Sequence, residues 1–237
     1  MFVRSLRHMP PHKVYGANQV RQLSRRNPQA TWIGRLMEAR RSMRLHNFFA
    51  KEMEKDPGDV KGTKLKILKY PHPKLRTENS VIEVFDDNLT EKAKQMLLVM
   101  YAADGIGLAA PQVGINERLM VFNEKGDPSE KETEMVLVNP TILGKSEDTN
   151  FREEGCLSFP QINGDVERSI TIDVEYQNLS GDKQVVSLKD LPARIFQHEY
   201  DHLDKVLFID RFDERDQKLN QKRLDKYVKK YGPGGAP

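Results

Sequence analysis

Apolar residues recur at helical spacing in three parts of the chain. The clearest stripe lies between Thr90, which can cap a helix, and residues 104–105, which end it. Its positions follow the i, i+3, i+4, i+7, i+8 pattern of a helix with one buried face, and they are Ala93, Met96, Leu97, Met100 and Tyr101. The pattern predicts an amphipathic helix whose apolar face belongs to the core.

Two further helices are predicted towards the carboxyl end. The first starts at Asp190, a suitable cap, and carries Pro192 in its first turn. Its apolar positions are Leu191, Ile195, Phe196 and Leu203. The second runs from about residue 213 to 230 and ends before Gly232. Its inward positions are expected to be Leu219, Leu224, Tyr227 and Val228.

Strands are predicted mainly between the first helix and the last two. Apolar and polar residues alternate over 170–176, and a turn at 178–182 leads into 184–188, which indicates a hairpin. The other candidate strands are the apolar or β-rich runs at 64–68, 118–123 and 135–139. Strands clustered between helices, rather than alternating with them, indicate an α+β fold.

The helix predicted from Asp190 carries His198 and His202 one turn apart. Side chains four residues apart project from one helical face, so both imidazoles could bind one metal ion. Glu199 is turned by about 100° around the helix, which places it beside such an ion, where a general base for water belongs. A surface helix that carries two histidines by coincidence has the same pattern. The pattern proposes metal-dependent hydrolysis without naming a substrate.

Cys156 is the only cysteine, so no intramolecular disulfide can form. A lone cysteine is commonly a small buried hydrophobe. A tetrahedral catalytic site, however, uses three protein ligands and one open position, and the helix supplies only two. Cys156 as a thiolate, with Gly155 beside it for backbone freedom, would complete a Cys-His-His set. The residues alone leave both interpretations open.

Residues 105–114 have little side-chain bulk, with three glycines and two alanines. The backbone of a ligand could approach such a segment closely. A nucleotide-binding loop is excluded because the predicted helix precedes the glycines and no Lys-Ser/Thr follows them. Within the segment, Gln112 could donate a hydrogen bond without adding charge, and a packed turn with an internally bonded glutamine is the alternative.

Three segments, 105–114, 154–158 and 197–202, occur in this order and closely resemble the signature motifs of the peptide deformylase family. Residues 70–76, Tyr-Pro-x-Pro-x-Leu-Arg, are also similar to that family. The resemblance extends from about residue 64 to 210 and is strongest to the bacterial-type branch of plant and algal organelles. It implies an α+β fold with antiparallel sheets packed around a central metal-binding helix, followed by a C-terminal helix.

The resemblance also implies roles for particular residues. The metal ligands would be Cys156, His198 and His202. The catalytic groups would be Glu199 as acid and base, and the Gln112 side chain and Leu157 N–H as donors to the oxyanion. The substrate-binding residues would be Ile106, Gly107, Glu154, Gly155 and Arg168. Glu154 and Arg168 would pair to hold the pocket, and an ordinary surface ion pair is the alternative for them.

The implied activity is removal of the N-formyl group from the formylmethionine of newly made polypeptides, with release of formate. The cofactor would be one divalent ion, ferrous iron first, with zinc, nickel and cobalt as alternatives. The partners would be nascent N-formylmethionyl chains, with transient proximity to the ribosome and no direct contact with nucleic acid or a membrane. No apolar run approaches the length that spans a bilayer.

Three other functions stay open. A zincin-like metallopeptidase shares the His-Glu-x-x-His pattern, but its third ligand normally lies downstream, and no histidine follows His202. A thiol hydrolase would use Cys156 with His198. A non-catalytic metal-binding or ribosome-associated module would need a defective site, whereas every expected catalytic residue is present.

Charge is divided unevenly along the chain. Residues 1–50 contain ten Lys/Arg and one acid, Glu38, which leaves 28 basic and 34 acidic residues in 51–237. The acidic body gives no sign of nucleic-acid binding. An Arg-rich, nearly acid-free start is typical of an organellar transit peptide, and a basic tail is the alternative. Few serines and many arginines favour the mitochondrion, with the plastid as the alternative.

The expected organisation is therefore a basic leader over 1–50 and a linker over 51–62, which is rich in charge, Pro and Gly. A catalytic domain over 63–231 and a flexible tail over 232–237 follow. One departure from the family pattern lies three residues after His202, where Lys205 replaces the usual glycine. A left-handed backbone there would cost about 1 kcal/mol relative to glycine.

Overall fold

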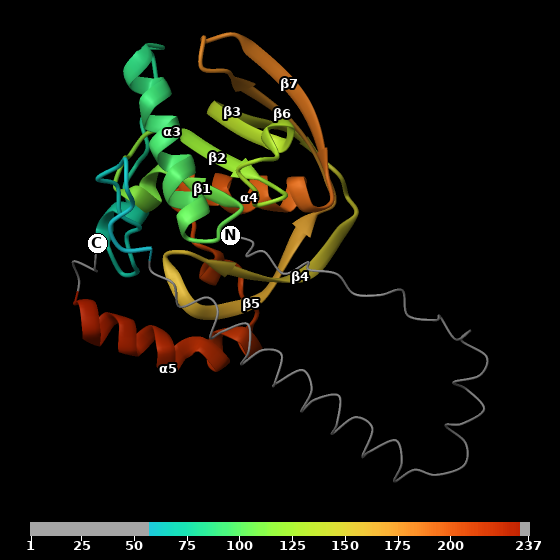
Figure 1. Cartoon of the computed structure of the whole chain (residues 1–237). Helices are drawn as coiled ribbons and strands as arrows, with labels where there is room; N and C mark the ends of the chain where they lie inside the picture. Colours follow the sequence, from blue (N-terminus) through green and yellow to red (C-terminus); the bar gives the residue numbers. More distant parts are fainter. Residues whose placement is uncertain (1–56, 233–237) are drawn as a thin grey trace. The chain divides into compact units, whose positions relative to one another are not determined.

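A computed structural model describes residues 57–232, so the expected leader, the first half of the linker and nearly all of the tail lie outside the described residues. The described part contains a five-stranded sheet in the order β1-β2-β3-β6-β7 and a two-stranded sheet of β4 and β5 (Figure 1). Every pairing within both sheets is antiparallel. The strands are β1 Gly107–Ala109, β2 Leu119–Asn123, β3 Glu134–Lys145, β4 Thr149–Cys156, β5 Phe159–Ser169, β6 Thr171–Gln177 and β7 Lys183–Lys189.

Among residues 57–232, three α-helices cover these sheets: α3 Asp87–Ala102, α4 Leu191–Leu203 and α5 Glu214–Tyr231. Short 3-10 turns lie at Pro73–Arg76, Ala110–Val113, Lys131–Thr133 and Phe208–Arg211. Helix α4 packs against β1, β2 and β7 of the large sheet and against β5 of the small one. The predicted α+β fold, with antiparallel sheets around a central helix and a C-terminal helix, is confirmed. None of the described helices is long and apolar enough to cross a membrane.

The apolar residues form clusters on the faces of these helices. One cluster joins α3 to the large sheet and contains Met96, Met100 and Leu119. A second fills the space between that sheet and α4 with Phe122, Ile195 and Phe196. Because α4 lies between this core and the β4–β5 hairpin, its polar residues are buried as well. The site described below is built into that layer.

Helix α3 starts a turn earlier than its apolar stripe predicts. Its N-cap is Asp86, whose side chain accepts a hydrogen bond of 2.9 Å from the Leu89 N–H. The prediction that Thr90 caps the helix is therefore wrong, because an aspartate upstream satisfies the free amides of the first turn. The predicted apolar face is otherwise buried, and only Tyr101 lies partly open.

Residues 64–68 do not form the predicted strand. Their backbone instead makes isolated contacts, such as the 2.8 Å bond from the Leu68 N–H to the Gln112 carbonyl. The Leu65 N–H bonds to the side chain of Thr63, just before this segment. An apolar run that lacks a continuous partner strand does not become part of a sheet.

The hairpin of β4 and β5 is absent from the sequence-based expectation. The first part of β4 is mostly exposed and, apart from Phe151, polar, so it lacks the alternation that marks a half-buried strand. Its buried end consists of Glu154, Gly155 and Cys156, which are not typical strand formers. The strand forms because β5 pairs with it from Thr149 to Cys156.

Helix α5 docks through two of its four predicted apolar positions, Leu224 and Tyr227, which pack against the core cluster around Phe159, and through polar groups. Leu219 and Val228 were expected to point inward, yet they are 64% and 45% exposed. The buried positions are Asp216 and Asn220, which bond to the Asp165 N–H at 2.6 Å and the Asn163 carbonyl at 2.8 Å. Because backbone groups at Asn163 and Asp165 of β5 need partners, polar side chains share this face with the apolar ones.

Candidate metal centre

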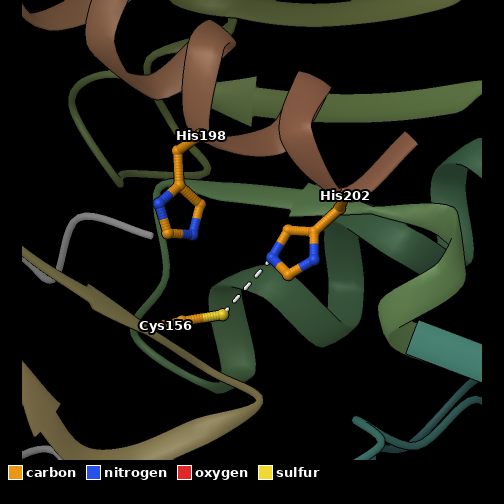
Figure 2. A group of neighbouring side chains, drawn as sticks. All are labelled: Cys156, His198 and His202. Atoms are coloured by element: carbon orange, nitrogen blue, oxygen red, sulfur yellow. Dashed lines mark hydrogen bonds between the residues drawn. The ribbon is translucent and has the colours of Figure 1, made fainter. Parts of the chain in front are cut away.

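Cys156, His198 and His202 meet between β4 and α4. Cys156 ends β4, whereas the histidines project from one face of α4 towards it (Figure 2). One potential ligand atom from each of the three lies within 4.8 Å of the others, and Cys156 Sγ is 3.4 Å from His202 Nε2. All three side chains are buried. Among the described residues this is the one group of three such side chains found close enough to share an ion.

The protonation of this cluster suits a cation. Burial raises the pKa of the Cys156 thiol to about 11 and lowers the pKa of His198 to about 4. Burial and the neighbouring His198 also hold the pKa of His202 well below its usual value. The imidazoles are therefore neutral at pH 7, which is the form that binds metals, and a bound cation would take the place of the thiol proton.

His198 is oriented for the same task. Its Nδ1 lies 2.9 Å from Glu154 Oε2, while its Nε2 is buried and has no hydrogen-bond partner within the described structure. A histidine that ligates a metal commonly donates its other ring N–H to a carboxylate in this way. The donor set and the unsatisfied nitrogen fit a metal ion. A thiol hydrolase fits less well, because a buried thiol with a raised pKa is a poor nucleophile.

Glu154 is shared by several donors. Arg168 binds it through two nitrogens at 3.0 and 2.9 Å, and Arg194 Nη1 binds it at 2.7 Å. Burial opposes its charge, but the contacts with Arg168 and His198 hold the pKa of Glu154 well below the usual value. Glu154 and Arg168 thus pair in the interior, and the alternative of a surface ion pair is wrong.

Two members of this network escaped the sequence analysis. Asp201 accepts a hydrogen bond of 2.5 Å from Arg168 Nη1 and two more from Arg211. Arg194 stands one turn before His198 on α4. The partners of Asp201 and Arg194 lie on other elements, so the sequence does not reveal them. The only signal in the sequence is that both residues stand at helical spacing from the histidines.

Glu199 lies beside the cluster, fully buried, against β1. Burial raises the pKa of its carboxyl to about 7, so the group can hold or release a proton near neutral pH. A Cβ added at Gly107 would stand 2.5 Å from Glu199 Oε1 and 2.8 Å from Ile195 Cγ2. Only glycine fits at residue 107 without moving the carboxylate.

Gln112 is held with its amide directed at the cluster. Its Oε1 accepts a hydrogen bond of 2.8 Å from the Ala109 N–H, and its Nε2 lies 3.4 Å from Cys156 Sγ. Leu157 directly follows Cys156, and its carbonyl accepts a 3.0 Å bond from Lys69 Nζ. One expected oxyanion donor, Gln112 Nε2, therefore lies beside the Cys156 sulfur, and the other, the Leu157 N–H, belongs to the next residue along the chain.

The remaining expected site residues frame the cluster. Ile106 is buried in the core beside α4 and precedes β1. Gly155 is buried on β4 between Glu154 and Cys156, opposite Asn163 of β5. Helix α4 itself starts at Leu191, and Asp190 is its N-cap residue, although the aspartate side chain makes no capping bond. The predicted residues thus come from β1 and the 3-10 turn Ala110–Val113 after it, from β4, β5 and the residues beside them, and from α4.

An α+β fold with a central His-Glu-x-x-His helix and a buried Cys-His-His group defines a class of proteins that could hold one ion beside a carboxylate. The chain belongs to the polypeptide deformylase family, because the family model matches residues 64–218. It is 48% identical over 169 residues to peptide deformylase 1B, chloroplastic/mitochondrial, of Arabidopsis thaliana, covering 71% of this chain and 62% of that protein. It is 43% identical to peptide deformylase of Thermotoga neapolitana, covering 65% of this chain and 91% of that one.

Solved structures agree. The crystal structure of plant peptide deformylase PDF1B is similar with a TM-score of 0.69 at 48% identity, covering 71% of this chain and 91% of that one. Peptide deformylase from Plasmodium falciparum gives a TM-score of 0.68 at 41% identity, covering 70% of this chain and 96% of that one. The chain spans 54–62% of the length of three plant relatives.

Proposed function

We propose that this chain is a metal-dependent hydrolase that removes the N-formyl group from the formylmethionine of new polypeptides and releases formate. The observation that carries the proposal is the buried group of Cys156, His198 and His202 with Glu199 beside it. Membership of the polypeptide deformylase family supports the substrate class.

The three clustered residues would hold one divalent ion, which supplies Lewis-acid activation of water and of the formyl carbonyl. Glu199 would take a proton from the attacking water and return it to the departing amine nitrogen. The Gln112 Nε2 and the Leu157 N–H would donate to the oxyanion, each worth roughly 3–4 kcal/mol. The raised pKa of Glu199, about 7, suits both directions of this proton transfer.

The substrate would lie along Ile106, Gly107 and Gly155. Gly155 has no side chain to obstruct an extended backbone, while Glu154 and Arg168 keep the hairpin and α4 in place behind it. The formyl carbon is small and unhindered, so a narrow site would exclude ordinary peptide carbonyls. Nascent N-formylmethionyl chains are the proposed partners, met near the ribosome, with no direct contact to nucleic acid or a membrane.

Ferrous iron is the proposed ion, with zinc, nickel or cobalt as substitutes. A thiolate and two imidazoles suit several of these ions, and geometry and availability decide among them. An organelle is the proposed location, because plant relatives are named chloroplastic or chloroplastic/mitochondrial. The arginine-rich leader over 1–50 favours the mitochondrion, and the plastid is the alternative.

The proposal is tested by formate release from a formyl-Met peptide, with protein prepared anaerobically and loaded with iron. The expected result is stoichiometric formate and a peptide with a free amino terminus. The N-acetyl-Met peptide serves as a matched control and should react far more slowly. Metal-loaded protein that releases no formate, or that cleaves an internal peptide bond instead, would contradict the proposal.

A further inference from the structure

Arg194 is a buried arginine to which neither the sequence motifs nor the proposed chemistry assigns a task. It is 2% exposed and is the largest among the fully buried side chains of the described residues. It stands on α4, four residues before His198, so the two side chains leave the same face of the helix. Its guanidinium is therefore directed at the same hairpin that carries Cys156.

The guanidinium of Arg194 reaches both strands of that hairpin. Nη1 donates to Glu154 Oε1 at 2.7 Å and to the Val166 carbonyl at 2.8 Å. Nη2 donates to the Asn150 carbonyl at 2.6 Å and to the Asn150 side-chain oxygen. One side chain thus joins α4 to β4 at two places and to β5 at a third.

Stability alone is a weak reason for such an arrangement. Burying a guanidinium removes it from water, and a buried ion pair is often no more stable than well-packed apolar residues of similar volume. Arg194 also shares its carboxylate, since Glu154 is already bound through two nitrogens of Arg168. What the contacts of Arg194 do specify is the position of α4 relative to β4.

That position decides the geometry of the ligand group. Cys156 belongs to β4 and lies two residues beyond Glu154, whereas both histidines belong to α4. Glu154 in turn accepts from His198 Nδ1 at 2.9 Å and so fixes the rotation of that ring. A change in the contact between Arg194 and Glu154 would therefore move Cys156 Sγ, because both Glu154 and Cys156 belong to β4. It would also turn the His198 ring, because Glu154 holds that ring through Nδ1.

We infer that Arg194 is a positioning residue that locks β4 to α4 and, through Glu154, holds His198 Nε2 and Cys156 Sγ at the separation needed to retain the ion. The inference rests on the proposed metal site. It assigns Arg194 no contact with substrate or with the ion. It predicts that changes at this residue alter how long an ion is held.

The test uses full-length protein loaded anaerobically with Co²⁺ and measures the rate of ion loss to excess EDTA, together with the visible spectrum of the bound ion. Arg194→Gln removes the charge and most of the donors, and Arg194→Lys keeps the charge with fewer bonds in a less rigid geometry. Arg118→Gln is the matched control, because Arg118 bonds to Leu203 and Asp204 at the far end of α4.

The expected result is ion loss about 10–100-fold faster for Arg194→Gln, with an altered thiolate-to-cobalt band, and an intermediate rate for Arg194→Lys. Arg118→Gln should lose the ion at nearly the wild-type rate. If Arg194→Gln does not fold, a several-fold faster loss from Arg194→Lys carries the inference, and a wild-type rate from it overturns the inference.

A purely structural role gives a different result. Thermal unfolding of the metal-free variants would then occur at lower temperature, while the rate of ion loss and the spectrum would match those of the wild type, and the inference would fail. Wild-type protein that binds no Co²⁺ would overturn the proposed metal site itself. The two failures are therefore distinguishable in one series of measurements.

Discussion

Gly107 is the position where one additional carbon would disturb the proposed chemistry most directly. Its missing Cβ leaves the space that Glu199 Oε1 approaches, 2.5 Å from where that carbon would stand. We expect Gly107→Ala to lower the rate of formate release by about 100-fold, because a shift of the order of 1 Å in a reacting group costs that much. The measurement is kcat, with metal content determined on the same sample.

The matched control for that substitution is Gly144→Ala on β3. A Cβ at residue 144 would meet Asp173 Oδ2 at 3.7 Å, which is an ordinary contact, so activity should stay close to the wild-type value. Normal kcat in Gly107→Ala would show that the carboxylate either tolerates displacement or has no catalytic part.

At the residue scale, the sequence revealed the chemistry that depends on local spacing. The i, i+4 relation of His198 and His202 sets their common face before any tertiary contact forms, and Glu199 follows from the same helix. Arg194 and Asp201 stand on that helix too, but their meaning depends on partners on β4 and β5. No spacing along the chain could reveal those partners.

At the scale of the element, α4 ends in a motif that normally contains glycine. The Val206 N–H bonds to the Asp201 carbonyl at 2.8 Å and the Lys205 N–H to the His202 carbonyl at 3.3 Å, which is a Schellman arrangement. Lys205 has a φ of 66°, in the left-handed region. Lys205 therefore has the left-handed backbone that was expected to be strained at the position where the family usually has glycine.

We predict that Lys205→Gly stabilises the protein by about 1 kcal/mol, because glycine adopts the left-handed conformation without a Cβ penalty. Urea unfolding of both proteins measures the difference. Lys205→Ala is the control, and it should give no such gain because alanine carries the same Cβ. Equal stability of the glycine variant and the wild type would mean that other contacts relieve the strain.

An ion pair joins the 3-10 turn after α4, Phe208–Arg211, to the 3-10 turn Pro73–Arg76. Its contribution to stability should depend on pH. Arg76 binds Asp210 through two nitrogens, at 2.5 and 2.8 Å. Partial burial opposes the charge of Asp210, but the hydrogen bonds from Arg76 and the Leu207 N–H hold its pKa below the ordinary value of 3.8. A lowered folded-state pKa means that the stabilisation is present above the unfolded pKa and is lost as pH falls through the folded one.

Asp210→Asn should therefore be less stable than the wild type at pH 7 by roughly 0.5–1 kcal/mol, a modest value because both side chains are partly exposed. The difference should stay constant down to about pH 5 and shrink as pH falls below 3.8, the unfolded value. Urea unfolding across this pH range measures it. A difference that grows on acidification would contradict the assignment.

The sequence predicted those helices and strands that have one continuous apolar face. The stripe of α3 and the alternation in β6 and β7 meet that condition, and these elements form as predicted, apart from the earlier start of α3. Helix α5 and strand β4 do not meet it, because Asp216 and Glu154 are buried through hydrogen bonds rather than through apolar area. A polar group that is buried with its partner looks like a surface residue until the partner is known.

At the scale of the whole molecule, the predicted leader over 1–50 and the described residues carry opposite net charge. We predict that deletion of residues 1–55 leaves formate release by the purified protein intact. The reason is that the truncated chain keeps Val60 and Leu65, which pack against the core cluster around Met96. Activity and thermal unfolding of the truncated chain are the measurements.

A longer deletion, of residues 1–66, is the control and should lower stability because it removes both of those side chains. Loss of fold in the shorter deletion would show that the leader belongs to the catalytic domain. A fluorescent fusion of residues 1–60 tests the targeting hypothesis separately, and cytosolic fluorescence would contradict it.

The central claim is that three residues hold an ion while a fourth moves the proton, and one paired measurement on Glu199→Gln tests it most directly. Metal content and formate release are determined on the same anaerobic preparation. Glutamine keeps the shape of the side chain but cannot accept the proton. The account predicts about one ion per chain and formate release lower by at least about 100-fold. An ion lost together with activity, or activity retained with the ion bound, would contradict it.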